Sequence, residues 1–235
     1  MTETLIVQQP QGMPQQLILL FHGVGGHPRE MLHLGQRLAA EFPQAMIVSV
    51  AAPHPSESGQ GRQWFSVVGI SDENRPARVR EAMPAFVAEV RQWQARSGVG
   101  FAATALIGFS QGGIMALEST RQEGALAGRV ASIGARFALL PEQALPQTTL
   151  HLFHGKTDAV IGYAHTIAAA ERLVALGADV TADVLPFVGH EINATIESLV
   201  IERLRGYIPR RLWEEALRAD PEAAACIRPA SGRLH

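Results

Sequence analysis

The chain has 235 residues, of which 47% are hydrophobic and 18% are charged. These proportions supply enough apolar side chains for a large buried core and exclude global disorder. The formal net charge is -2, and no run of Lys or Arg could follow a phosphate backbone. Nucleic acid is therefore excluded as an expected partner.

A single cysteine, Cys226, excludes an intrachain disulfide framework and fits a reducing compartment. The N-terminus lacks the basic head and apolar middle of a signal peptide. The longest apolar runs, such as residues 17–21, are too short to cross a bilayer. The sequence therefore predicts a cytoplasmic protein without an integral membrane segment.

Short apolar runs alternate along the chain with longer runs of helical periodicity. Strands are predicted at residues 17–21, 45–50, 103–109, 129–133, 150–153 and 180–184, with an antiparallel first strand at 4–7. Helices are predicted over residues 31–42, 79–97, from 111 onward, 167–176 and 192–200. Pro84 leaves a kink or a late start open for the second helix. This order predicts an α/β fold: a mostly parallel sheet with helices on both faces.

Two regions stand apart from this regular alternation. Residues 52–62, rich in Pro and Gly, form the longest irregular stretch, and a loop of that length in a compact domain is typical of a binding loop or lid. Residues 206–235 follow the last αβ unit and contain a predicted short helix at 209–220. The predicted organisation is one α/β domain over residues 1–205 and a C-terminal extension over 206–235.

The most specific motif is Gly108-Phe109-Ser110-Gln111-Gly112, which matches G-x-S-x-G between a predicted strand and a predicted helix. On such a tight turn the flanking glycines prevent clashes of Cβ atoms. The serine hydroxyl then stands at a helix N-terminus, where free N–H groups favour developing negative charge. The alternative is a chance match in a chain with 22 glycines, and the strand-turn-helix context argues against it.

A serine nucleophile needs a base and an orienting acid. Asp158 follows one predicted strand and His190 follows the next, so both lie at the carboxyl edge of a parallel sheet with Ser110. Their order, Ser then Asp then His, is that of α/β-hydrolases. Alone, either residue would more often be a helix cap or a turn residue. Three other acidic residues fit the acid position less well: Asp179, Asp183 and Glu191.

An oxyanion hole requires two N–H donors beside the nucleophile. The N–H of Gln111, which follows the serine, is the first candidate, and the N–H of Val24 in Phe21-His22-Gly23-Val24-Gly25-Gly26 is the second. The alternative for this glycine-rich loop is phosphate binding. G-x-G-x-x-G spacing and the Walker Lys-Ser/Thr pair are both absent from it, which disfavours that reading.

Together the segments HGVGG, GFSQGG, HGKTDAVI and GHEI resemble the phospholipase/carboxylesterase family of small α/β-hydrolases, which includes acyl-protein thioesterases. The resemblance covers about residues 17–205, and Trp64-Phe65 resembles the family's Trp-aromatic pair. It implies Ser110, Asp158 and His190 as the catalytic triad, with Val24 and Gln111 as oxyanion donors. It also implies action on carboxylic esters and thioesters without a metal or cofactor.

Two positions depart from the family pattern: Gly26 stands where many members carry Asp, and Gly162 where many carry Pro. Neither position supplies a catalytic side chain, so we expect changes in loop shape and specificity only. The loops at residues 52–62 and 67–75 are expected to shape the acyl site.

The sequence therefore predicts a serine hydrolase that forms an acyl-enzyme with a small-molecule ester or acyl thioester. A dienelactone-type hydrolase is disfavoured, because it requires an elbow cysteine and the chain's cysteine is Cys226. The remaining alternative is a non-catalytic relative that binds an acyl ligand or a protein partner. The acyl chain length, the preference for ester or thioester and the oligomeric state, a homodimer included, are left open.

Overall fold

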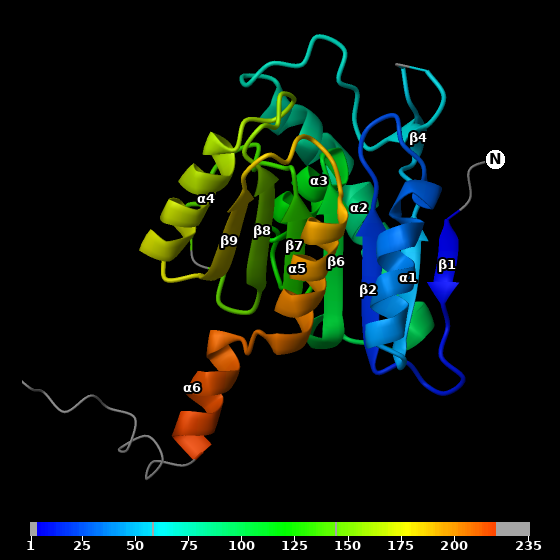
Figure 1. The fold of residues 1–235 in the computed structure, drawn as a ribbon, viewed down its shortest axis with the longest axis vertical. Helices are drawn as coiled ribbons and strands as arrows, with labels where there is room; N and C mark the ends of the chain where they lie inside the picture. Colours follow the sequence, from blue (N-terminus) through cyan, green and yellow to red (C-terminus); the bar gives the residue numbers. More distant parts are fainter. Residues whose placement is uncertain (1–3, 58, 144, 220–235) are drawn as a thin grey trace, which may run out of the picture.

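The computed structural model describes residues 4–57, 59–143 and 145–219, and a seven-stranded sheet forms its centre (Figure 1). From edge to edge the strands are β1 (Leu5–Gln8), β3 (Ala45–Val50), β2 (Gln16–Phe21), β6 (Thr104–Phe109), β7 (Arg129–Ile133), β8 (Thr149–Gly155) and β9 (Asp179–Leu185). β1 pairs antiparallel with β3, and every other neighbouring pair in this sheet is parallel. The predicted fold class and the antiparallel first strand are confirmed.

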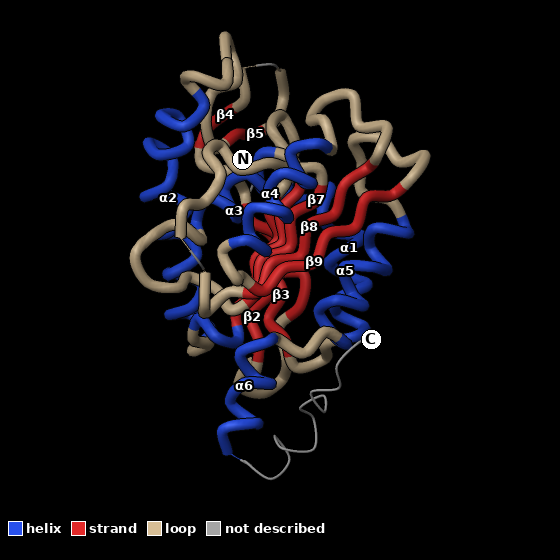
Figure 2. Tube along the Cα trace, turned by 90° about the vertical axis from the view of Figure 1, so that its left-hand side faces the viewer, coloured by secondary structure: helices blue, strands red, loops and turns tan. Residues whose placement is uncertain are grey.

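Helices cover both faces of the sheet (Figure 2). One face carries α1 (Leu32–Glu41) and α5 (Ala194–Gly206), and the other carries α2 (Arg75–Ser97), α3 (Gln111–Ser119) and α4 (Ala164–Ala175). The alternation of side chains along a strand explains the two layers. In β2, Leu17, Leu19 and Phe21 belong to the core on the side of α2, α3 and α4. Ile18 and Leu20 belong to the core on the side of α1 and α5.

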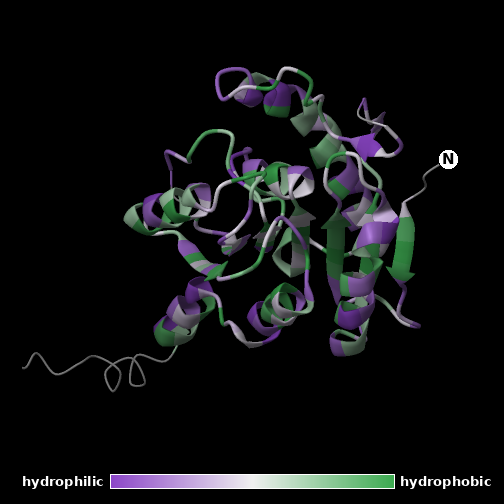
Figure 3. Cartoon of the chain, turned by 45° about the horizontal axis from the view of Figure 1, so that its top comes forward, coloured by the Kyte–Doolittle hydropathy of each residue, from purple (hydrophilic) through white to green (hydrophobic). Residues whose placement is uncertain are grey.

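The hydropathy of the elements follows from this burial. Figure 3 shows hydrophobic colouring along the central strands and mixed colouring on the helices around them. All six residues of β3 and all seven of β8 are buried, as expected of strands with a helix layer on each face. Within the described parts of the chain, no helix is both long and apolar enough to span a membrane.

The second predicted helix is longer than its apolar pattern indicated. α2 begins at Arg75, nine residues before Pro84, so the late start left open by the sequence is wrong. Pro76 lies in its first turn, where a proline costs no intrahelical hydrogen bond. Gly98 ends the helix with a left-handed conformation (φ 72°).

The irregular stretch after β3 contains a small hairpin, β4 (His54–Pro55) with β5 (Arg62–Gln63), between which Ser58 lies outside the described residues. Arg62 exchanges backbone hydrogen bonds with the glycine-rich loop: its N–H donates to Gly26 and its carbonyl accepts from Gly25. The segment therefore joins the end of β2, where one oxyanion donor is predicted.

The C-terminal extension contains α6 (Arg210–Ala219), which lies at the opposite end of the sheet from the carboxyl ends of the parallel strands (Figure 1). The Arg210 N–H donates to Asp179 at the start of β9, and Arg211 donates to Thr149 at the start of β8. The predicted helix thus docks at the amino-terminal edge of the sheet. The remainder of the predicted extension, with Cys226, lies outside the described residues.

Candidate active site

Ser110 occupies the sharp turn between β6 and α3 and has backbone angles of φ 51° and ψ -118°. Non-glycine residues rarely adopt a positive φ, and such strain concentrates at functional sites. The turn requires glycine on both sides. A Cβ on Gly108 would lie 2.4 Å from the backbone of Gly112, and one on Gly112 would lie 2.4 Å from the carbonyl oxygen of Phe21.

The structure brings together the three predicted residues. His190 Nε2 lies 2.9 Å from Ser110 Oγ, and His190 Nδ1 lies 2.7 Å from Asp158 Oδ2. The side chain of Asp158 is fully buried and that of His190 is 16% exposed. An ionised carboxylate only accepts hydrogen bonds, so this arrangement places the imidazole proton on Nδ1 and leaves Nε2 free to accept the serine proton.

Asp158 is held in its ionised form by a ring of donors. Its Oδ1 accepts hydrogen bonds of 2.8 Å from the N–H groups of Val160 and Ile161. Burial acts to raise the pKa of this carboxyl, but the hydrogen bonds from His190, Ile161 and Val160 outweigh it and the pKa lies below its ordinary value. The acid is therefore charged at neutral pH.

A second histidine, which the sequence reasoning missed, lies against the same acid. His154 Nε2 is 2.7 Å from the carbonyl oxygen of Ile161 and 3.2 Å from Asp158 Oδ2, and its Nδ1 is 2.7 Å from Thr166 Oγ1. The ring is fully buried at the end of β8. The signal that could have found it was its position in the HGKTD segment, four residues before Asp158.

The glycine-rich loop after β2 lies beside Ser110. A Cβ on Gly23 would be 3.2 Å from the Ser110 Cβ. A hydrogen bond from the Gly26 N–H to the Gly23 carbonyl closes a turn, and Val24 is the first central residue of that turn. The buried side chain of His22 connects this loop to the segment after β3. Its Nδ1 lies 2.7 Å from the Gly23 carbonyl oxygen, and its Nε2 accepts a hydrogen bond from the Ala52 N–H.

The side chain of Gln111 has a structural contact that the sequence did not predict. Its Oε1 accepts a hydrogen bond of 2.7 Å from the Trp64 N–H, and its Nε2 donates one of 2.8 Å to the Phe65 carbonyl. The Trp64-Phe65 pair is thereby fixed to the residue that follows Ser110. The quoted GFSQGG and Trp-aromatic motifs were the signal that these segments belong to one site.

Two further contacts confine His190. Its ring lies 4.8 Å from that of Phe109, centroid to centroid. On the side of the acid, a Cβ on Gly134 would be 3.2 Å from His190 Nδ1 and 3.4 Å from Asp158 Oδ2, so the absence of a side chain there leaves room for the histidine. Gly134 also has a positive φ of 54°, which favours glycine.

None of the three other acids considered from sequence forms a hydrogen bond or ion pair with the His190 ring in the described structure. Asp179 accepts from the hydroxyl of Tyr207 at the far end of the sheet, and Asp183 pairs with Arg203 at 2.9 Å. Glu191 accepts only a long hydrogen bond, 3.4 Å, from Asn193 in the described structure.

The two departures from the family pattern have different surroundings. A Cβ on Gly26 would approach Glu30 Oε2 to 2.4 Å, whereas one on Gly162 would meet no atom within 4 Å. A side chain at position 26 would therefore displace Glu30, and one at position 162 would be accommodated.

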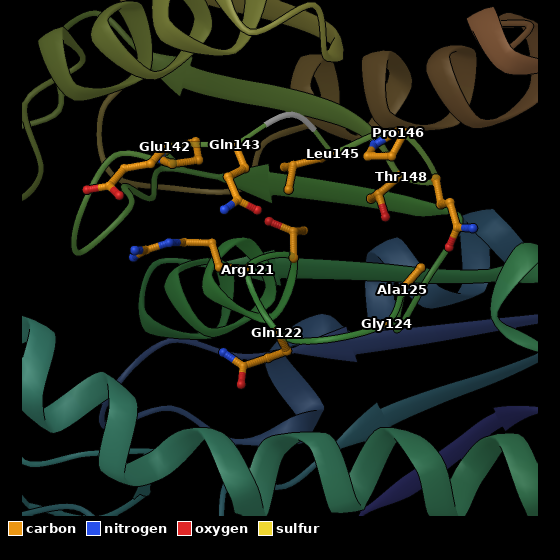
Figure 4. A pocket seen from close by; sticks show the side chains of 12 residues that line it. Arg121, Gln122, Gly124, Ala125, Glu142, Gln143, Leu145, Pro146 and Thr148 are labelled. Atoms are coloured by element: carbon orange, nitrogen blue, oxygen red, sulfur yellow. The ribbon is translucent and has the colours of Figure 1, made fainter.

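A hollow of about 400 Å³ lies away from these residues (Figure 4). It separates the segment after α3, with Arg121 and Gln122, from residues 141–143 and 145–148, and neither Ser110 nor His190 lines it. Among the described residues, no group of three or more His, Cys, Asp or Glu side chains could hold a metal ion. The candidate site is therefore the one at the carboxyl edge of the sheet.

Comparison with known proteins identifies the class to which this fold and site belong. The sequence model of the phospholipase/carboxylesterase family matches residues 2–205. The chain belongs to this family and is a hydrolase with the α/β-hydrolase fold. The family and the fold predicted from the four segments are confirmed.

Individual relatives carry names in keeping with this class. Esterase YpfH of Escherichia coli (strain K12) is 50% identical over 212 residues, which are 90% of this chain and 91% of that protein. The crystal structure of esterase PE8 is 27% identical, with a TM-score of 0.79 over 88% of this chain and 99% of its own. A carboxylesterase from Mesorhizobium loti, 20% identical with a TM-score of 0.69, covers 81% of this chain and 88% of its own and shares the fold.

Proposed function

We propose that the protein is a serine esterase that cleaves carboxylic esters, and acyl thioesters, through an acyl-enzyme on Ser110. One observation carries the proposal: the unbroken hydrogen-bonded chain from Ser110 Oγ through His190 to Asp158, at 2.9 and 2.7 Å. A nucleophile, its base and the base's orienting group in hydrogen-bond reach are what acyl transfer requires.

In the first step His190 Nε2 takes the Ser110 proton as Oγ attacks the ester carbonyl. Asp158 fixes the tautomer of the ring and stabilises the imidazolium that forms. The imidazolium then protonates the leaving alcohol or thiol, and the acyl group stays on Ser110. A water molecule, activated by the same base, attacks the acyl-enzyme and releases the acid.

The negative charge of the tetrahedral intermediate requires N–H donors, which we assign to Val24 and Gln111. Gln111 is the first residue of α3, so its N–H has no partner within the helix. Val24 is the first central residue of the turn closed by Gly26, whose hydrogen bond does not use the Val24 N–H. Each such donor supplies about a hundredfold to a thousandfold in rate.

The test is hydrolysis of p-nitrophenyl esters from acetate to palmitate by the native protein and by Ser110→Ala. We expect the variant to lose at least about a thousandfold in kcat, since the residues of a triad act as a unit. Labelling of the native protein, and not of Ser110→Ala, by a fluorophosphonate would identify the nucleophile. Equal rates in both proteins would refute the proposal, and thiol release from an acyl-coenzyme A series would decide its thioester part.

A further inference from the structure

Two arginines near the candidate site share a single carboxylate. Arg136 Nη1 lies 2.9 Å from Asp72 Oδ1, and Arg75 Nη2 lies 3.8 Å from the same oxygen. The arginine side chains are 14% and 17% exposed, whereas that of Asp72 is 67% exposed. The cations are thus mostly withdrawn from water, and the anion between them faces it.

The ion pair joins the segment after β7 to the segment that leads into α2. Arg136 comes two residues after Gly134, which lies against His190 and Asp158, so it is within about 7 Å of it along the backbone. On the other side, the first turn of α2 is tied back to the Trp64-Phe65 segment, because Arg78 donates to the Ser66 carbonyl. Arg136 thus lies close to the candidate site, and Arg75 lies beside Arg136 through their shared contact with Asp72.

The charges of this cluster are not balanced. Two guanidinium groups face one carboxylate, and Arg75 Nε is buried without a hydrogen-bond partner. Buried donors in folded proteins are normally satisfied, and an unsatisfied one calls for an explanation. Burial, and then the charge of Arg136, lower the pKa of Arg75, and burial and Arg136 likewise lower the pKa of the neighbouring His165. A second anion would oppose the effect of the Arg136 charge on both groups.

We propose that Arg75 and Arg136 form a subsite for a carboxylate on the substrate, so that the preferred substrates are esters carrying a free carboxylate a few carbons from the reacting carbonyl. This inference rests on the proposed esterase function. The position of Asp72 already demonstrates that a carboxylate fits against Arg136. Guanidinium groups bind carboxylates through paired, charge-assisted hydrogen bonds, and the unused Arg75 Nε–H supplies a further donor.

The experiment compares kcat/KM for two matched pairs of esters. Monoethyl glutarate is paired with ethyl glutaramate, and 4-acetoxybutyrate with its amide, so that only the charge differs within a pair. We expect the native protein to prefer the charged member of at least one pair by about tenfold or more, the magnitude of one charged hydrogen bond. Arg75→Met and Arg136→Met should bring this ratio close to one. Arg80→Met, at an exposed position on the same helix, should leave it unchanged.

Asp72→Asn separates a binding role from a merely structural one. Removal of the competing carboxylate frees both cations, so the preference for the charged ester should rise. If the Arg136–Asp72 pair only ties two loops together, the same change should lower activity on both esters equally. Arg136→Lys keeps the charge but not the planar donor pair, and it should retain part of the preference if Arg136→Met fails to fold.

The outcomes distinguish this inference from the proposed function. Hydrolysis that depends on Ser110 but shows no preference for the charged member of either pair would overturn the carboxylate subsite alone. Hydrolysis of the p-nitrophenyl esters without hydrolysis of either charged ester would likewise overturn the subsite, and absence of Ser110-dependent hydrolysis of all these esters would overturn the esterase proposal. Calorimetric titration of Ser110→Ala with monoethyl glutarate measures binding without turnover. If adding Arg136→Met to this variant abolishes the binding, the subsite is supported. If Ser110→Ala binds monoethyl glutarate and ethyl glutaramate equally well, the subsite is refuted.

Discussion

The imidazole of His154 lies 3.2 Å from Oδ2 of Asp158, the same oxygen that faces His190 at 2.7 Å. His154 also faces the Ile161 carbonyl at 2.7 Å, and the Ile161 N–H donates to Asp158 Oδ1. Ile161 is therefore held at its carbonyl by His154 and at its N–H by Asp158. We expect His154 to be a positioning residue, which acts on His190 through Asp158 and its loop.

We expect His154→Leu to lower kcat/KM for a p-nitrophenyl ester by about tenfold to a hundredfold, the effect of a small misplacement of catalytic groups. The loop would hold Asp158 Oδ1 less well, so the pKa of Asp158, now below its ordinary value, would rise. Activity requires the ionised acid, so the acid limb of the profile of kcat/KM against pH should move to higher pH. A pH series on both proteins measures the shift.

His154→Gln provides the conservative comparison, because its amide N–H can still reach the Ile161 carbonyl. It should recover part of the lost activity and of the shift in the acid limb. A uniform loss of activity at every pH in both variants, with no shift, would show that His154 contributes only to packing.

Gln111→Leu should destabilise the protein and impair catalysis together. The substitution leaves the buried N–H of Trp64 and carbonyl of Phe65 without partners, at a cost of about 1–3 kcal/mol each. It also frees the segment that packs against the residue after the nucleophile. Urea unfolding measures the first effect, and kcat/KM for a p-nitrophenyl ester measures the second.

Gln94→Leu is the matched control, since Gln94 is also a buried helical glutamine whose side chain forms hydrogen bonds. Its Nε2 donates to Thr104 Oγ1 and to the Leu126 carbonyl, at the opposite end of the sheet from Ser110. We expect Gln94→Leu to lower the free energy of unfolding about as much as Gln111→Leu does and to leave kcat unchanged. If Gln111→Leu also left kcat unchanged, the contact to Trp64 and Phe65 would be structural only.

Gly134→Ala should reduce activity more than stability. Its positive φ makes the alanine cost about 1–2 kcal/mol, and the added Cβ would press on His190 Nδ1 at 3.2 Å. Displacement of the imidazole should lower kcat/KM by about tenfold to a hundredfold. Gly124→Ala is the control: it has a similar backbone strain (φ 74°), but no atom lies within 4 Å of the added Cβ. It should therefore be less stable than the native protein and equally active. Equal kcat/KM values in the two variants would contradict the steric argument.

The sequence predicted the positions of Ser110, Asp158 and His190 because each one lies shortly after the end of a strand: Ser110 directly follows β6, Asp158 follows the end of β8 and His190 follows the end of β9. Parallel strands end at one edge of the sheet, so their following residues converge whatever the loops do. Their geometry agrees with a triad, while their catalytic roles stay a prediction until the serine variant is assayed.

Contacts that depend on loop conformation could not be predicted in this way. Arg136 and Asp72 are separated by 64 residues, and no periodicity encodes their ion pair. The β4–β5 hairpin was missed because strands of two residues carry no alternating pattern. The true start of α2 did have a signal, the proline at position 76 in its first turn.

The last prediction concerns stability in acid and the buried imidazole of His151. Its Nε2 accepts from Arg129 at 3.2 Å and its Nδ1 faces Thr181 Oγ1 at 2.8 Å. Burial, and then the charge of Arg129, lower the pKa of His151 from its ordinary 6.5 to about 3. The unfolded chain therefore binds a proton at this side chain between these pH values, whereas the folded protein does not. Proton uptake favours unfolding as the pH falls through that window.

We expect the free energy of unfolding of the native protein to fall across this range by up to about 1.4 kcal/mol per pH unit from this residue alone. His151→Gln removes the titrating group, so its stability relative to the native protein should improve steadily from pH 6.5 down to about 3. Urea unfolding at a series of pH values measures the difference. His54→Gln, at an exposed position, should leave the pH dependence unchanged. Parallel stability curves for His151→Gln and the native protein would show that His151 titrates alike in the folded and unfolded states.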